Sequence, residues 1–117
     1  MTGGFDEREK GFEAKYRHDQ ETEFKITARR NKLLGLWAAE KMGIEGTSAE
    51  AYAKEVVTAD FEEVGDGDVV RKVLGDFKTK GLAVDEPMLR KEMERLTGVA
   101  REQITAAAGP DEPKTLA

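Results

Sequence analysis

A chain of 117 residues is long enough for one domain and too short for two ordinary ones. Charged residues make up 37% of it and apolar residues 38%, so a small core must carry a heavily solvated surface. The formal net charge of −5 argues against a general nucleic-acid binder, because neutralisation of phosphates dominates such binding. The absence of cysteine excludes disulfides, thiolate metal sites and cysteine nucleophiles.

Neither a membrane span nor a secretory signal is evident in the sequence. No run reaches the roughly 20 apolar residues that a membrane-spanning helix needs. Residues 1–7 lack both the basic start and the apolar stretch of a signal peptide, so we expect a cytoplasmic protein that does not insert into a membrane. Apolar residues recur at intervals of three and four, which predicts an all-α fold with four helical segments.

The first predicted helix lies within roughly residues 20–43. Gly43 is a suitable C-terminal cap, because glycine adopts the left-handed conformation without a side-chain clash. A broad apolar face distinguishes this segment, and it consists of Phe24, Ala28, Leu33, Leu34, Leu36, Trp37 and Met42.

The second predicted helix has the clearest amphipathic pattern in the chain. Thr47 with Glu50 fits a capping box, although the neighbouring Ser48 could cap the helix instead. Gly65 is expected to end it. Its apolar positions have the spacing of a buried stripe, which comprises Ala49, Tyr52, Ala53, Val56, Val57, Phe61 and Val64.

The third predicted helix runs from about residue 68 to residue 80. Asp66 or Asp68 supplies its start and Gly81 its end. Its apolar stripe consists of Val69 or Val70, followed by Val73, Leu74 and Phe77.

The fourth predicted helix begins after Asp85, with Pro87 in the first turn, where a helix needs no amide donor. Its stripe comprises Leu89, Met93, Leu96, Ala100, Ile104 and Ala107. The glycine and prolines of residues 109–117 predict a disordered tail. Because the four stripes can bury only against one another, we expect a compact four-helix bundle-like domain over residues 20–108.

The segment 5–25 differs from the rest because it mixes seven acids with five bases. Three pairs, Asp6–Lys10, Glu13–Arg17 and Glu21–Lys25, stand four apart with the acid first, which stabilises a helix by about 0.2–0.5 kcal/mol per pair. Gly11 costs about 1 kcal/mol in a helix interior. These local contributions roughly cancel, so an isolated helix here would be marginal.

Three aromatic residues of this segment fall on one helical face. Phe5, Phe12 and Tyr16 are separated by seven and four positions. Three side chains form too thin a stripe to anchor a fold, yet they fit a helix laid into a groove on a partner. We therefore expect an N-terminal arm that is mobile when free and helical when bound. The spacing alone also fits an extension of the first helix that packs on its own bundle.

The opening stretch from Phe5 to Tyr16 resembles the start of the zeta subunit, the ATPase-inhibitor protein of alphaproteobacterial F-type ATP synthases. The resemblance runs from about Phe5 to Ile104 and omits only the tail. Several ordered blocks in one chain are far more specific than a single short motif. The further matching blocks are Ala28 to Ala39, Ala51 to Ala53, Ala59 to Glu63, and Gly65 to Val73 with Asp68, Arg71 and Lys72.

The resemblance implies a regulatory protein that is not an enzyme and that needs no cofactor. In the family, the arm enters the interface between an alpha and a beta subunit of the F1 head, near the gamma stalk, and blocks ATP hydrolysis. The implied partners are the alpha, beta and gamma subunits of F1-ATPase, and the free protein is expected to be a monomer. ATP synthase would hold it at the cytoplasmic face of the inner membrane.

We therefore divide the chain into an inhibitory arm at 1–19, the four-helix domain at 20–108 and the tail at 109–117. Tyr16 stands in place of a phenylalanine found in a relative, which keeps the aromatic face. The partner-binding positions that the resemblance carries onto this chain are Phe5, Asp6, Arg8, Phe12, Glu13, Lys15 and Tyr16.

Three features of the sequence mimic functional sites but have simpler interpretations. The lone histidine, His18, cannot build a multi-histidine metal site and is interpreted as an exposed polar residue. The run 66–68, Asp-Gly-Asp, resembles the start of a calcium loop but lacks the later ligands, so we expect it to cap a helix. Trp37 is expected to anchor the core. No metal site is predicted.

Asp60 interrupts the apolar stripe of the second helix, and we expect it to form a structural ion pair with Arg29, Arg30 or Arg71. The run Arg29-Arg30-Asn31-Lys32 favours a solvated face or pairing within the bundle, although it could meet phosphate. Two other functions therefore stay open. One is a helical adaptor that binds another protein through the bundle surface, and the other is a nucleotide-binding module built on Arg29, Arg30 and Lys32.

Overall fold

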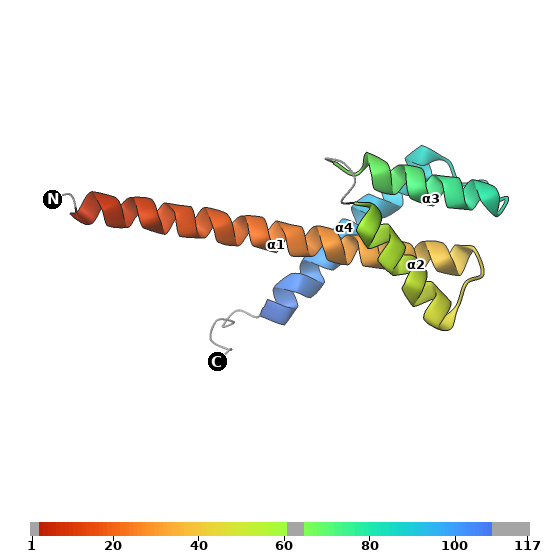
Figure 1. Ribbon diagram of the computed structural model, residues 1–117, viewed down its shortest axis with the longest axis horizontal. Helices are drawn as coiled ribbons and strands as arrows, with labels where there is room; N and C mark the ends of the chain where they lie inside the picture. Colours follow the sequence, from red (N-terminus) through yellow and green to blue (C-terminus); the bar gives the residue numbers. More distant parts are fainter. Residues whose placement is uncertain (1–2, 61–64, 109–117) are drawn as a thin grey trace.

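A computed structural model of the chain describes the backbone of residues 3–60 and 65–108, and the side chains from residue 17 onward within these ranges. Every regular element in the described part is an α-helix, which confirms the predicted all-α, four-helix fold (Figure 1). The four helices are α1 (Gly3–Lys41), α2 (Gly46–Ala59), α3 (Gly67–Thr79) and α4 (Glu86–Ala108). The predicted tail, 109–117, lies outside the described residues.

Helix α1 begins far earlier than the apolar pattern predicted, at Gly3 rather than near residue 20. Its 39 residues span about 58 Å at 1.5 Å per residue. A segment that is marginal as an isolated helix can be helical here because it extends an existing helix and needs no new nucleus. The N-terminal half of α1 points away from the other three helices, so it does not pack on its own bundle (Figure 1).

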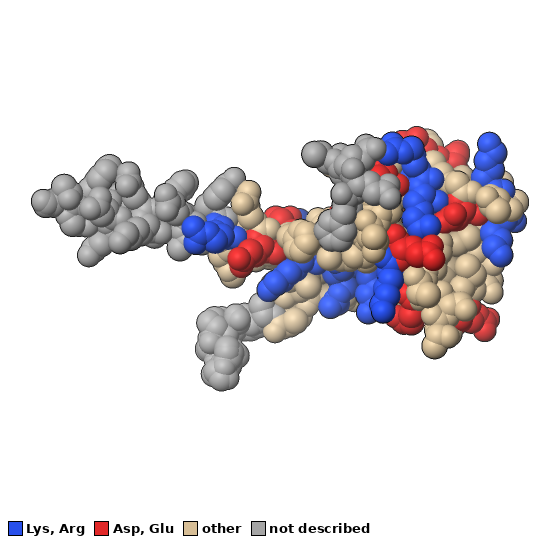
Figure 2. All heavy atoms as spheres, in the orientation of Figure 1, with Lys and Arg blue, Asp and Glu red and all other residues tan. Residues whose placement is uncertain are grey.

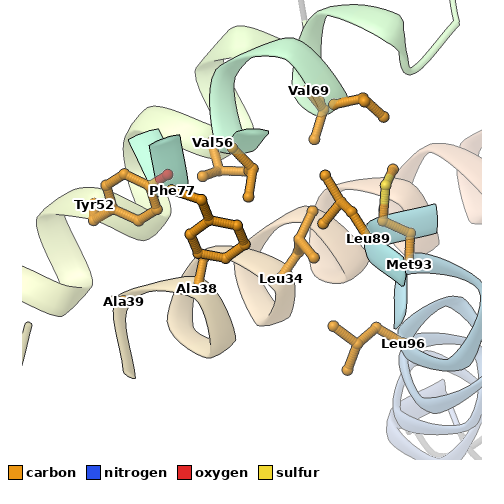
Figure 3. Packing of buried hydrophobic residues seen from close by; sticks show 12 residues of the cluster. Leu34, Ala38, Ala39, Tyr52, Val56, Val69, Phe77, Leu89, Met93 and Leu96 are labelled. Atoms are coloured by element: carbon orange, nitrogen blue, oxygen red, sulfur yellow. The ribbon is translucent and has the colours of Figure 1, made fainter. Parts of the chain in front are cut away.

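The core forms where α2, α3 and α4 all pack against the C-terminal half of α1. Leu34 of α1, Val56 of α2, Phe77 of α3 and Leu89 of α4 are completely buried and converge there (Figure 3). Trp37 packs against this cluster, with its ring edge-to-face on that of Phe77 at a centroid distance of 5.8 Å, so its predicted role in the core is confirmed.

The crossing of α1 over α2 is close because one residue has no side chain. A Cβ atom placed on Gly35 would lie 2.6 Å from the Cα atom of Ala53, which real structures do not allow. Ala38 and Ala39, both fully buried, continue this small surface along α1. The alanine-rich faces therefore bring two helix backbones together that larger residues would hold apart.

The helix ends agree with the sequence in some places and differ in others. Gly43 and Gly81 follow α1 and α3 with a φ of 78° each, as predicted for C-terminal caps. Helix α4 starts after Asp85, whose Oδ1 accepts a hydrogen bond from the backbone nitrogen of Met88 at 3.0 Å. The capping box predicted at Thr47 is wrong, since α2 begins at Gly46 and its N-cap residue, Glu45, makes no side-chain capping bond.

Three predicted stripes differ from the buried surfaces in detail. Phe24 is 60% exposed, whereas Ile26, two residues later, is 2% exposed and faces the bundle. In α4 the stripe is buried as far as Ala100, but Ala107 is exposed because α4 has passed α1 by that point. The last two positions predicted for the second stripe, Phe61 and Val64, lie outside the described residues, and α2 itself ends at Ala59.

Candidate functional site

The predicted partner-binding positions all lie on the projecting half of α1. The backbone of Gly3–Lys41 is one continuous helix, so positions 5, 12 and 16 fall within about 40° of one another around its axis at 100° per residue. Residues 6, 8, 13 and 15 share the same helical segment. The side chains of all seven positions lie outside the described part of the structure, and their roles therefore stay predictions.

The described part of the projecting half carries one apolar feature that sequence reasoning assigned to the core. The exposed ring of Phe24 helps to line a shallow hollow of about 380 Å³ together with Arg17, Gln20, Glu21 and Lys25. The signal that could have found it is local, because charged residues flank Phe24 on both sides while Ile26 begins the buried spacing. This hollow lies on the same helix as the predicted arm, just before the body of the molecule.

Helix α4 crosses α1 at the point where α1 leaves the body (Figure 1). The guanidinium of Arg101 donates to both carboxylate oxygens of Glu23, at 2.7 and 3.2 Å, and this hydrogen bond lowers the pKa of Glu23. Arg29 donates from Nη1 to Oε1 of Gln103 at 2.7 Å. Because these groups are exposed, their interactions join α1 to α4 but contribute little to the free energy of folding. The ion pair predicted between Glu21 and Lys25 is absent among the described side chains.

A buried polar cluster lies where α1, the end of α2 and the start of α3 meet. Arg30 is 9% exposed and donates from Nε to Oδ1 of Asn31 at 2.8 Å. Burial lowers the pKa of Arg30, while the charges of Asp66 and Asp60 oppose that shift. Burial raises the pKa of Asp60, against an opposing interaction with Asn31. The cluster therefore serves the packing of the three helices.

The expected ion pair of Asp60 is only partly realised. Asp60 lies at the C-terminal end of α2, where the side chain of Asn31 and the charge of Arg30 both lower its pKa, against the effect of burial. The amide nitrogen of Asn31 is buried and lacks a hydrogen-bond partner within the described residues. Sequence reasoning missed Asn31 because a buried amide inside a basic run has no signature in the pattern.

The basic run 29–32 does not converge on one ligand. Arg29 is turned towards α4, Arg30 is buried in the polar cluster, and Lys32 lines a hollow beside α2. The nucleotide-binding alternative needed all three side chains around one phosphate. Arg30 is buried away from the other two, and Arg29 is engaged by Gln103, so the three side chains do not surround one phosphate as that alternative requires.

A second polar network joins α2 to α3. The hydroxyl of Tyr52 donates to Oδ2 of Asp76 at 2.7 Å, and burial together with this bond raises the pKa of Tyr52. Lys72 bridges Asp76 and Glu55 at 3.1 and 3.0 Å, and its ammonium lies 5.1 Å from the centre of the Tyr52 ring. Burial lowers the pKa of Lys72, but its bonds to the two carboxylates outweigh this and leave it raised. The network therefore links α2 to α3 in the folded protein.

The run 66–68, which mimics a calcium loop, lies at the start of α3 but makes no side-chain capping bond from its N-cap residue. Asp66 is the N-cap residue of α3 and its carboxylate pairs with Arg90 at 3.3 Å, while Oδ1 of Asp68 accepts a bond from the backbone of Val69. In the part of the chain that the structure describes, no group of three or more histidine, cysteine, aspartate or glutamate residues could hold a metal ion. Nor is any helix there long and apolar enough to cross a bilayer.

The fold thus defines a small helical protein in which a single long helix extends well beyond a four-helix body. The sequence profile of the ATPase inhibitor subunit zeta family matches residues 1–103. The chain therefore belongs to this family, as its sequence motifs had indicated. It is an ATPase inhibitor and a regulatory protein rather than an enzyme, and this membership implies that it binds F1-ATPase.

One solved structure supports the same fold. A protein whose structure was determined in solution by NMR is 54% identical to this chain, with a TM-score of 0.63. The match covers 69% of this chain and 92% of that one. No curated protein matches the chain.

Proposed function

We propose that this protein blocks ATP hydrolysis by inserting its N-terminal arm between an alpha and a beta subunit of the F1 head, near the gamma subunit. The observation that carries the proposal is the projection of α1. Twenty residues, 3–22, precede the bridge at Glu23, and at 1.5 Å per residue they provide about 30 Å of helix. A single helix that protrudes from a packed body has the shape of an insert.

The arm has the composition of a helix that binds in a groove. Its aromatic positions 5, 12 and 16 share one face, and burial of each ring would contribute about 1.5–3 kcal/mol. The interspersed acids and bases offer both signs of charge to a polar cleft, which favours orientation and encounter more than affinity. Because the body already holds the root of the helix, binding orders fewer residues than it would in a free peptide.

Inhibition follows if the arm prefers one conformation of the catalytic interface. A rotary enzyme opens and closes each interface in turn, and a ligand shifts such an equilibrium only by its difference in affinity for the two states. A shift from 1:99 to 99:1 requires a preference of about 10⁴-fold. The protein would act as a monomer, held by ATP synthase at the cytoplasmic face of the inner membrane.

Deletion of residues 1–17 tests the proposal. The shortened chain should lose inhibition of ATP hydrolysis by F1, while its far-ultraviolet circular dichroism keeps the helical signal of residues 20–108, because the core lies in the C-terminal half of α1 and in α2–α4. Removal of residues 109–117 is the matched control and should leave inhibition intact. If the chain without residues 1–17 inhibited as strongly as the whole protein, the arm mechanism would be wrong.

A finer test replaces Phe5 and Phe12 together with alanine. Loss of two buried rings should raise the half-inhibitory concentration at least about 100-fold, the equivalent of roughly 3 kcal/mol. The adaptor alternative predicts the opposite result for both experiments, since binding through the bundle surface would survive changes to the arm. Unchanged potency of the double variant would remove the aromatic face from the mechanism.

A further inference from the structure

One stretch of α1 carries bases and no acids. Residues 24–39 contain Lys25, Arg29, Arg30 and Lys32 but neither aspartate nor glutamate. This local excess of positive charge is notable because the chain as a whole has a net charge of −5. It follows directly after the projecting half of α1, which carries both acids and bases.

Three of these bases form a stripe along one face of the helix. Lys25, Arg29 and Lys32 are spaced at four and three positions, which places them on neighbouring turns of α1. We call these three residues the basic stripe. Arg30 does not belong to it, because its side chain is buried in the polar cluster. In Figure 2, lysine and arginine side chains gather along α1 where it leaves the body.

No carboxylate within the described residues neutralises the basic stripe. Lys25 and Lys32 are exposed and form no ion pair there, and Arg29 is bound to the neutral amide of Gln103. Lys54 of α2 adds a further charge, since it lines the same hollow of about 300 Å³ as Lys32, with Glu50 as the only acid in that lining. The arginines of α4 differ, because each is held by a carboxylate: Arg90 by Glu86 and Asp66, Arg95 by Glu92, and Arg101 by Glu23.

We infer that the basic stripe docks on an acidic protein surface at the mouth of the cleft that receives the arm. This inference rests on the proposed function, because the arm fixes where the stripe arrives. Lys25 follows Gly3 by 22 residues of unbroken helix, or about 33 Å, so full insertion of the arm brings the stripe to the rim. Charges at such a rim accelerate encounter and orient the partner.

The other anionic surfaces fit the basic stripe less well. Recruitment to an anionic membrane takes clusters of about four to eight lysines and arginines, more than the stripe provides. A nucleic acid would be repelled by the remaining surface of an acidic chain. An acidic patch on the same protein that holds the arm could match the basic stripe, because Lys25 and Lys32 are only about two helical turns apart.

Charge reversal at two positions tests the inference. We compare the full-length protein with the variant K25E/K32E and with the matched control K78E/K80E, which makes the same change of charge at exposed lysines near the end of α3. The measurement is the association rate constant for inhibition of F1-ATPase at 50 and 500 mM salt. We expect K25E/K32E to associate about 10-fold more slowly at low salt, a gap that closes at high salt because exposed charges are then screened.

Two further measurements separate this inference from the proposed function. At saturating concentration, K25E/K32E should still inhibit fully, since the arm is intact, and its thermal unfolding should match that of the parent protein. An unchanged association rate would contradict the docking role of the basic stripe and would leave the arm mechanism unaffected. An equal loss of association rate in K78E/K80E would assign the effect to overall charge. Sedimentation with vesicles of anionic lipid that depends on Lys25 would assign it to a membrane. Either result would contradict the docking role of the basic stripe.

Discussion

The two halves of α1 belong to one continuous helix but differ in whether other helices pack against them. The C-terminal half buries Ile26, Leu34, Ala38 and Ala39 against three other helices, and its helicity is sustained by packing. The N-terminal half has no neighbouring helix among the described residues, and its sequence mixes acids and bases with three aromatic positions on one face (Figure 1). The comparison teaches that a continuous helix can carry its fold at one end and its partner surface at the other.

The largest effect that separates the halves is expected from truncating one apolar side chain in each. Leu34→Ala removes a fully buried side chain of the packed half and should lower the free energy of unfolding by about 2–5 kcal/mol. Phe24→Ala, in the exposed region before the body, should change it by less than about 0.5 kcal/mol. Urea unfolding followed by circular dichroism measures both. A similar loss in the two variants would contradict the division.

A smaller effect is expected at the crossing of α1 and α2. Gly35→Ala forces a Cβ atom against the backbone of Ala53 and should cost about 1–3 kcal/mol of stability. Gly75→Ala in α3 is the matched control, because no atom lies within 4 Å of its added Cβ, and it should stabilise the protein by about 0.5–1 kcal/mol. Thermal unfolding of the two variants compares them. Equal stabilisation by both alanines would show that the crossing is not tightly packed.

Replacement of Tyr52 by phenylalanine sharpens the comparison within the body. Loss of the bond to Asp76 should cost about 0.5–1.5 kcal/mol at pH 7. The pKa of Tyr52 is raised in the folded protein, so the contribution of its neutral hydroxyl is complete below the unfolded pKa near 10 and declines as the pH rises above it. The difference between parent and variant, measured by urea unfolding from pH 7 to pH 11, should therefore narrow above about pH 10. A constant difference would argue against the hydrogen bond.

The smallest effect is expected at Asp60. Burial raises its pKa, so the ionised carboxylate opposes folding at neutral pH, and this penalty is absent below its unfolded pKa, where the group is protonated in both states. Asp60→Asn should accordingly raise stability at pH 7 by less than about 1 kcal/mol, given the partial exposure of the group. Near pH 3 the gain should vanish. A loss of stability at pH 7 would instead show that the charge of Arg30 governs this site.

Much of the body could be predicted from the sequence because α3 and α4 are amphipathic and end at clear signals. Val69, Val73 and Phe77 of α3, and Leu89, Met93 and Leu96 of α4, are buried as their spacing indicated. The same spacing rule misplaced Phe24, because the first helix is apolar on several sides and only tertiary contacts select Ile26. Capping was misjudged at Thr47, because the N-cap residue of α2 is Glu45, two residues earlier than the pattern suggested.

The candidate site was predicted from a resemblance to a family and not from the spacing of apolar residues. The positions of the arm followed from a resemblance in sequence, while the continuity of α1 was one of two alternatives that the spacing of Phe5, Phe12 and Tyr16 left open. The burial of Asn31 and Asp68 was also missed. Polar residues have no periodic signature of burial, and only the meeting of three helices encloses them.

The unbroken course of α1 also has a mechanical consequence. No proline interrupts Gly3–Lys41, so the helix runs from its free end to the body without a proline kink. About 30 Å of this helix precedes Glu23, whose carboxylate accepts hydrogen bonds from Arg101 of α4. If the arm binds as proposed, force on its tip would pass along α1 to the close contact between the backbones at Gly35 and Ala53.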